Sequence, residues 1–162
     1  MSITSLARLI RRTGRVAEPE PAAPAPLPDA PRALAGSLQI RHVDAGSCNG
    51  CEIEIANAFG PVYDGERYGC RLVASPRHAD ALMITGVVTR NMREPLEMTE
   101  AATPQPRVIV AVGDCAIGRG PFAGGFGVAG CASDFVHVDL EVPGCPPEPG
   151  AIIEALRTVT RR

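Results

Sequence analysis

The residues best suited to chemistry in this chain are cysteines that follow predicted strands. A Cys-x-x-Cys pair, Cys48 and Cys51, comes after one apolar run, and Cys115 and Cys145 each follow another. In an open parallel sheet, the loops at the carboxyl ends of the strands gather in one crevice, where such folds bind ligands. We therefore expect these four thiols to lie at one site, although long stretches of sequence separate them.

Four thiolates at one site suit either zinc or an iron–sulfur cluster. Structural zinc usually takes two Cys-x-x-Cys pairs, whereas this chain has one pair and two single cysteines, and that dispersal favours a cluster. Amides at the start of the helix predicted after the pair would stabilise an anionic cluster. The Pro-Gly-Cys-Pro-Pro sequence around Cys145 gives the last thiol a turn of fixed shape.

Two further cysteines stay outside the predicted ligand set. Cys70 stands at the start of a strand, where a small buried apolar residue is expected. Cys131 lies in the loop before the last predicted strand, where it either competes with Cys115 or simply packs. The pair Cys48 and Cys51, between a strand and a helix, also resembles a dithiol redox motif. A dithiol oxidoreductase and a zinc-stabilised interaction module are therefore alternatives to an electron-transfer protein.

The other polar residues form no catalytic constellation in the sequence. His42, His78 and His137 have no serine or cysteine partner at a catalytic spacing, so each is expected to be structural. Glu52 and Glu54 face different sides of their helix, and the helix dipole alone explains Glu52. All 16 basic residues are arginine, which excludes Schiff-base lysines and the lysine of a phosphate-binding loop. We expect no catalytic acid, base or nucleophile on this chain.

Length and composition indicate one globular domain. The chain has 162 residues, 45% of them hydrophobic, which is enough for a packed core. Its formal charge of −2 provides no basic field for nucleic acid. We find neither a signal-peptide pattern nor an apolar run long enough to span a bilayer. The cysteines are therefore expected to be reduced and cytoplasmic, and available for metal or redox chemistry.

The elements that must position the cysteines alternate between strands and helices. This alternation predicts an α/β fold, a parallel sheet flanked by helices. Strands are expected at 38–43, 71–74, 81–85, 108–112 and 135–140. Helices are expected at 51–59, 89–102 and 150–159. The second helix should start near Glu94, because Pro95 fits only a first turn. The glycine-rich stretch after Cys115 predicts a loop whose backbone a partner can approach closely.

Two segments precede this domain in the sequence. Residues 1–16 place Ile3, Leu6, Leu9 and Ile10 at helical spacing among arginines. This pattern predicts a short basic amphipathic helix, either frayed or lying on a partner or an anionic membrane surface. Proline and alanine dominate residues 17–36, which predicts a semi-rigid extended linker. The α/β domain is expected to span residues 37–162.

Several ordered motifs carry a family resemblance. They are Asp-Ala-Gly-Ser-Cys-Asn-Gly-Cys-Glu-Ile-Glu-Ile at 44–55, Glu-Arg-Tyr-Gly at 66–69, Ser-Pro-Arg-His-Ala-Asp at 75–80, Thr-Gly at 85–86, Gly-Asp-Cys at 113–115 and Val-Pro-Gly-Cys-Pro-Pro at 142–147. Together they resemble the 20-kDa iron–sulfur subunit family of complex I (NADH:quinone oxidoreductase) and energy-converting nickel–iron hydrogenases. The resemblance spans about residues 38–160. It implies a flavodoxin-like domain with one 4Fe-4S cluster on Cys48, Cys51, Cys115 and Cys145.

The first ligand pair separates two branches of this family. Complex I members typically have two adjacent cysteines there, whereas Cys48 and Cys51 have the spacing of the formate hydrogenlyase small subunit. The resemblance therefore implies an electron-transfer subunit next to the large subunit of a membrane-associated nickel–iron hydrogenase. A complex I subunit that passes electrons to quinone is the alternative.

The resemblance also implies partners and a location. A ferredoxin-like iron–sulfur subunit and membrane-arm subunits are expected beside the large subunit. The chain would lie in the cytoplasm, peripheral on the inner face of the cell membrane through its complex. Arg77 and Arg90 match basic positions that lie near the cluster or its interface in this family.

Overall fold

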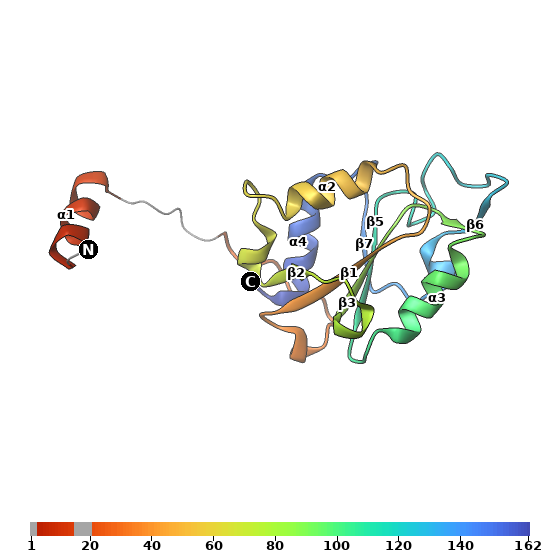
Figure 1. The fold of residues 1–162 in the computed structure, drawn as a ribbon, viewed down its shortest axis with the longest axis horizontal. Coiled ribbons are helices and arrows are strands. Elements are labelled where there is room, and N and C mark those ends of the chain that lie inside the picture. Colours follow the sequence, from red (N-terminus) through yellow and green to blue (C-terminus); the bar gives the residue numbers. More distant parts are fainter. Residues whose placement is uncertain (1–2, 15–20) are drawn as a thin grey trace.

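The protein folds around a five-stranded parallel sheet, as a computed structural model describing residues 3–14 and 21–162 shows (Figure 1). The strands are β1 (Leu38–Asp44), β2 (Cys70–Leu72), β3 (Ala81–Thr85), β5 (Val108–Val112) and β7 (Leu140–Val142). They lie in the order β2-β1-β3-β5-β7, and every neighbouring pair is parallel. Counted within this sheet alone, the order is 2-1-3-4-5, which is the flavodoxin-like arrangement.

Helices cover both faces of the sheet. The covering helices are α2 (Gly50–Ala58), α3 (Arg93–Ala102) and α4 (Pro149–Thr160), whereas α1 (Ile3–Thr13) lies apart from the sheet (Figure 1). Side chains of α2 and α4 share one core cluster with alternate strand residues such as Ile40 and Met83. Leu96 of α3 joins the second cluster, on the opposite face, with Leu82 and Ile84. The predicted α/β class, with a parallel sheet flanked by helices, is thus confirmed.

The two central strands explain why their positions could be predicted. Every residue of β3 and β5 is buried, because helices or turns cover the strands from both sides. A parallel strand covered on both faces appears in a sequence as a continuous run of branched apolar residues. The predicted strands at 81–85 and 108–112 match the observed bounds for this reason.

The predicted strand at 135–140 is wrong, because β7 begins only at Leu140. Phe135 and Val136 instead close a turn, in which both backbone amides donate to Ala132 O at 3.1 and 3.0 Å. Val136 is buried in the second core cluster, so this apolar side chain packs the turn against the core and does not belong to a strand. Asp139 then caps the edge of β5, where its carboxylate accepts a hydrogen bond from the backbone amide of Ile109 at 2.7 Å.

A second, two-stranded sheet includes the end of the glycine-rich stretch after Cys115, which the sequence predicts to be a loop. It pairs β4 (Val88–Thr89) with β6 (Val128–Gly130) in antiparallel fashion. Arg90 N also donates to Gly127 O at 2.9 Å. The glycine-rich loop is therefore held at its far end against the segment that follows β3.

Residues 21–36 pack against the sheet domain. Arg157 of α4 donates through Nη2 to Pro21 O at 2.9 Å. Leu34 is buried in the core beside α4 and β1. The packed unit therefore reaches beyond Ser37 toward the N-terminus. None of the described helices is long and apolar enough to cross a membrane.

Candidate functional site

The structure brings together the four cysteines that the sequence singled out. Cys48, Cys51, Cys115 and Cys145 line one cavity of about 80 Å³. The first two follow β1, the third follows β5 and the fourth follows β7, all at the carboxyl end of the sheet. The predicted convergence of these residues is therefore confirmed, and it is consistent with loops that follow the carboxyl ends of parallel strands.

Two of the four thiols are buried and two are exposed. Cys51 is 9% exposed and Cys115 is 8% exposed, whereas Cys48 and Cys145 face the outside. Burial raises the pKa of Cys51 to about 12, and Glu52 and the other three thiols add to the increase. Burial also raises the pKa of Cys115, again with neighbouring thiols contributing. Cys51 is therefore protonated at neutral pH, and a metal that binds it must displace the proton.

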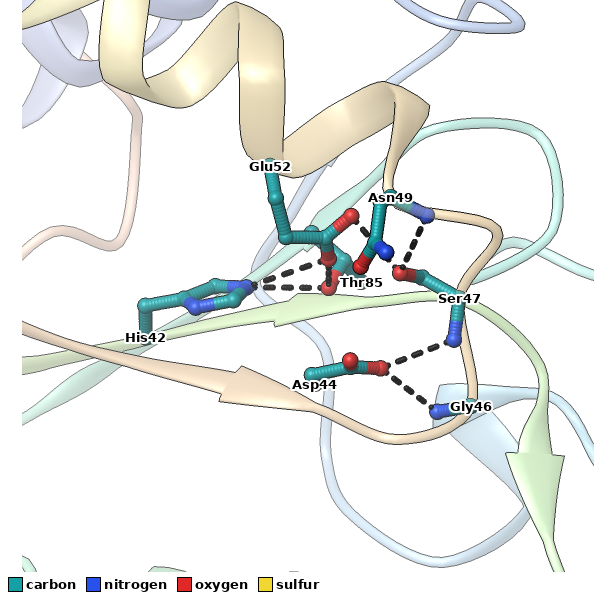
Figure 2. A network of polar contacts seen from close by, with 7 residues as sticks. All are labelled: His42, Asp44, Gly46, Ser47, Asn49, Glu52 and Thr85. Atoms are coloured by element: carbon teal, nitrogen blue, oxygen red, sulfur yellow. Dashed lines mark hydrogen bonds and ion pairs between the residues drawn. The ribbon is translucent and has the colours of Figure 1, made fainter.

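The Cys-x-x-Cys turn is held by the residue that ends β1. Asp44 Oδ1 accepts hydrogen bonds from the backbone amides of Gly46 and Ser47, both at 2.8 Å (Figure 2). Ser47 Oγ in turn accepts one from the amide of Asn49 at 3.0 Å. Asn49 has a left-handed backbone, with φ of 69°, and leads directly into α2. One thiol therefore precedes the helix and the other lies in its first turn.

Glu52 ties this turn to the end of β3. Its Oε2 atom accepts a hydrogen bond from Ser47 Oγ at 2.6 Å, and its Oε1 atom accepts one from Thr85 Oγ1 (Figure 2). His42 Nε2 lies 2.9 Å from Thr85 Oγ1 and 3.5 Å from Glu52 Oε1. Burial lowers the pKa of His42, although the nearby carboxylates oppose this effect. The network thus fixes the start of α2 on the sheet. Glu52 therefore does more than interact with the helix dipole, which is the only role that the sequence predicts for it.

We predict that Glu52→Gln loosens this turn. The amide side chain is uncharged and retains one oxygen, so one of the two hydroxyl groups loses its acceptor and the other keeps only a neutral one. Because a hydrogen bond to a charged group contributes about 1.5–3 kcal/mol, we expect an iron–sulfur cluster reconstituted on the predicted ligands Cys48 and Cys51 to lose iron to a chelator about tenfold faster. The measurement is the anaerobic rate of bleaching. Glu54→Gln is the matched control, since the Glu54 carboxylate accepts its hydrogen bond from the exposed Asn57, at 3.3 Å. Equal rates in both variants would contradict the role of Glu52.

Asp114 joins the loop of Cys115 to the loop of Cys145. Its backbone amide donates to Gly144 O at 2.8 Å, and its Oδ1 atom accepts from Gly144 N at 2.9 Å. The backbone amide of Phe122, in the glycine-rich loop, hydrogen-bonds the Cys115 thiol. Two loops that are distant in sequence therefore form one wall of the cavity.

Two glycines allow the backbone to approach the buried sulfurs. A Cβ atom on Gly113 would lie 2.5 Å from Cys51 Sγ, and one on Gly120 would overlap Cys115 Sγ. Gly113 also has a φ of +92°, a conformation that side chains disfavour. Any larger residue at either position would fill space beside a thiol.

The other two cysteines lie outside this cavity. Cys70 is 2% exposed and packs in the core at the start of β2. Cys131 lines a neighbouring cavity of about 200 Å³ that also reaches Cys115, and its thiol hydrogen-bonds Asp134 Oδ2 at 3.3 Å. Within residues 3–14 and 21–162, no three His, Cys, Asp or Glu side chains are grouped closely enough to hold a single metal ion.

The two arginines noted in the sequence lie in different places. Arg77 is in a 3₁₀ helix (Pro76–His78) that precedes β3, so it lies at the amino end of that strand. The four cysteines follow the carboxyl ends. Arg90 instead lies against the glycine-rich loop, with its guanidinium carbon 4.8 Å from the ring centre of Phe126.

Sequence reasoning assigned no site role to Ser47 or Thr85 and treated His42 as structural. Their polar contacts join β1, β3 and α2, which a linear pattern does not reveal. Thr85 was visible only as part of the Thr-Gly motif. Cavity size would not have found the site either, because a cavity of about 670 Å³ beside Arg41 and Pro95 contains no cysteine.

Comparisons with known proteins identify the family of this chain. A family model described as NADH ubiquinone oxidoreductase, 20 Kd subunit, matches residues 48–159. The chain is 44% identical over 117 residues to the probable membrane-bound hydrogenase subunit mbhJ of Pyrococcus furiosus, covering 72% of this chain and 70% of that protein. It is also 44% identical over 117 residues to formate hydrogenlyase subunit 7 of Escherichia coli K12, covering 72% of this chain. It spans 46% of the length of that subunit.

A more distant relative and a solved structure extend the comparison. An NADH-quinone oxidoreductase subunit of Carboxydothermus hydrogenoformans is 38% identical over 104 residues, which are 64% of this chain and 63% of that protein. A chain of the membrane-bound sulfane sulfur reductase, an archaeal respiratory membrane complex, superposes with a TM-score of 0.69 at 29% identity, covering 80% of this chain and 71% of that one. The matched residues 48–159 include all four cysteines of the cavity and every strand of the main sheet except β1. The chain therefore belongs to the NADH ubiquinone oxidoreductase 20 Kd subunit family.

Proposed function

We propose that this chain is an electron-transfer subunit that holds one 4Fe-4S cluster on Cys48, Cys51, Cys115 and Cys145. One observation carries the proposal: these four thiols border a single cavity in a member of an oxidoreductase subunit family. The chain contributes no catalytic acid, base or nucleophile under this proposal. It belongs to a multisubunit oxidoreductase, and its task is to position a redox centre.

The donor set fits a group that bonds several sulfurs at once. Four thiolates are the usual ligands of a 4Fe-4S cluster. They come from three loops and surround a cavity, and the missing side chains of Gly113 and Gly120 keep the space beside the buried sulfurs open. When bound, such a cluster accepts and releases single electrons.

The chain's own residues would set the potential of this centre. The backbone amide of Phe122 already hydrogen-bonds Cys115 Sγ, and such bonds favour the more negative, reduced state. The positive end of the α2 dipole faces the same side, since α2 begins between Cys48 and Cys51. The Glu52 carboxylate instead disfavours the more negative, reduced state, because its charge interacts unfavourably with a thiolate at Cys51.

The exposed side of the site favours coverage by a partner subunit. Cys48 and Cys145 are exposed, and the adjacent glycine-rich loop presents Phe122 at 48% and Phe126 at 89% exposure. We infer that the large subunit of a nickel–iron hydrogenase covers this side. Electrons would cross that interface from a ferredoxin-like iron–sulfur subunit, and membrane-arm subunits would hold the complex on the inner face of the cell membrane.

A hydrogenase complex is favoured over a quinone reductase by two observations. The pair Cys48 and Cys51 has the Cys-x-x-Cys spacing expected of the hydrogenase branch. The hydrogenase and hydrogenlyase relatives are 44% identical to this chain, against 38% for the NADH-quinone oxidoreductase relative. A complex I-type subunit that donates electrons to quinone is the second candidate.

Electron paramagnetic resonance tests the cluster directly. After anaerobic reconstitution, we expect a signal of a reduced 4Fe-4S centre at low temperature in dithionite, with about four iron and four sulfide per chain. A folded, colourless protein that holds zinc or no metal would reject the proposal and favour a zinc-stabilised module or a dithiol oxidoreductase. Circular dichroism on the same sample establishes that the domain is folded.

A further inference from the structure

Helix α1 separates apolar and basic side chains on opposite faces. At about 100° per residue, Leu6, Leu9 and Ile10 fall within an arc of about 100°, and three arginines occupy the opposite arc. The apolar three are between 46% and 49% exposed. The arginines are Arg8, Arg11 and Arg12, and they are exposed as well. The apolar stripe is thus left for something else to cover.

The helix needs such a surface in order to be stable. It has 11 residues, and isolated helices of this length are marginal in water. Figure 1 shows α1 apart from the sheet domain, and none of its described residues belongs to either core cluster. Its order therefore depends on burying Leu6, Leu9 and Ile10 elsewhere.

The N-terminal segment that contains α1 is purely basic, which favours an anionic surface as its binding partner. Residues 1–17 contain four arginines and no acidic residue, while all 18 acidic residues lie at or beyond Glu18. An amphipathic helix with a basic polar face and an aliphatic opposite face suits the interface of an anionic bilayer. In such a helix, arginine stems lie along the apolar boundary while their guanidinium groups reach the lipid phosphates.

The attachment point of the linker is basic too. Arg67, Arg161 and Arg162 line a hollow of about 490 Å³ together with Pro21, where the described linker meets the domain. The six residues 15–20 separate Gly14 from Pro21, and an extended chain of that length reaches at most about 25 Å. When a surface holds α1, this basic side of the domain therefore stays within about 25 Å of the helix.

We propose that α1 binds the surface of an anionic phospholipid bilayer and tethers the domain to it. The helix lies in the interface with Leu6, Leu9 and Ile10 toward the acyl chains. This contact is the chain's own and is independent of the cluster. It adds a direct lipid attachment to the one that a complex would supply through its membrane subunits.

Vesicle flotation with the full-length reconstituted chain tests this contact. The vesicles are phosphatidylcholine alone or with about one third phosphatidylglycerol. We expect binding to the anionic vesicles only, and about a hundredfold weaker binding for R8Q/R11Q/R12Q, because each basic residue near an anionic surface contributes about fivefold. The variant L6S/L9S/I10S should lose binding at every salt concentration, since it lacks the apolar stripe.

The control variant loses the same number of positive charges, but from the sheet domain and not from α1. R32Q/R71Q/R93Q removes three exposed arginines of the domain and should bind vesicles like the unaltered chain. Unchanged cluster absorbance and circular dichroism in each variant establish folding. Failure of the unaltered chain to float with anionic vesicles would overturn the proposal and leave a protein surface as the occupant. Equal binding to neutral vesicles, or equal losses in the control, would also overturn it.

Discussion

Replacing Cys115 with serine is expected to remove the cluster or convert it to one with fewer irons. Cys115 is buried at the cavity, receives the Phe122 amide hydrogen bond and packs against the Gly120 backbone. Serine keeps the shape of the side chain but is a much weaker ligand for iron than a thiolate. We expect iron per chain to fall from about four to three or fewer, and the 4Fe-4S signal to disappear. Iron and sulfide assays on anaerobically reconstituted protein measure the change.

Cys70→Ser is the matched control for this substitution. Cys70 is also buried, and burial raises its pKa to about 12, so both variants place a hydroxyl group where a buried thiol was. Of Cys70 and Cys115, only Cys115 lines the cavity of the four cysteines. The Cys70 variant should be less stable to denaturant while retaining full iron content. If Cys115→Ser kept as much iron as the unaltered chain, the assignment of the ligands would be wrong.

The convergence of the cysteines was predictable because it depends on topology. Once the apolar runs at 81–85 and 108–112 are recognised as buried parallel strands, the loops that follow them must meet at one edge. The same rule places Cys48 and Cys145 there, even though the last strand was placed wrongly. An error of several residues in β7 did not move Cys145, because the cysteine follows the strand's end in both cases.

The polar network around the first turn was not predictable in the same way. Ser47, Glu52 and Thr85 meet because α2 settles on β3 at one particular rotation. No hydrophobic periodicity specifies a contact between short polar side chains that lie far apart in the sequence. Glu52 has a sufficient local explanation at the start of a helix, and that explanation concealed its longer-range contacts.

The segment that leads into the sheet domain shows a similar limit. Proline and alanine predict an extended segment, but composition does not say whether such a segment is solvated or packed. Arg157 hydrogen-bonds its backbone, and Leu34 enters the core. An extended segment exposes carbonyl groups along its length, and a buried arginine on a neighbouring helix supplies the donors that hold it.

Gly113→Ala is the second substitution from which we expect loss of the cluster. The new Cβ atom would lie 2.5 Å from Cys51 Sγ, closer than a carbon and a sulfur can approach without bonding. Gly113 N also donates to Val142 O at 2.8 Å, so the backbone cannot retreat without losing contact with β7. We expect the thiol of Cys51 to be displaced and iron per chain to fall below about half of the unaltered value.

Strain and crowding can be separated with a second glycine of the same loop. Gly124 has a φ of +78°, close to the +92° of Gly113, but a Cβ atom there would meet nothing within 4 Å. Both alanine variants therefore carry the same left-handed backbone penalty, about 1 kcal/mol, and only Gly113→Ala crowds a thiol. If the two variants lose iron equally, backbone strain accounts for the loss. If only Gly113→Ala loses iron, the bare backbone at this position is part of the cluster site, as the proposed ligation by Cys51 requires.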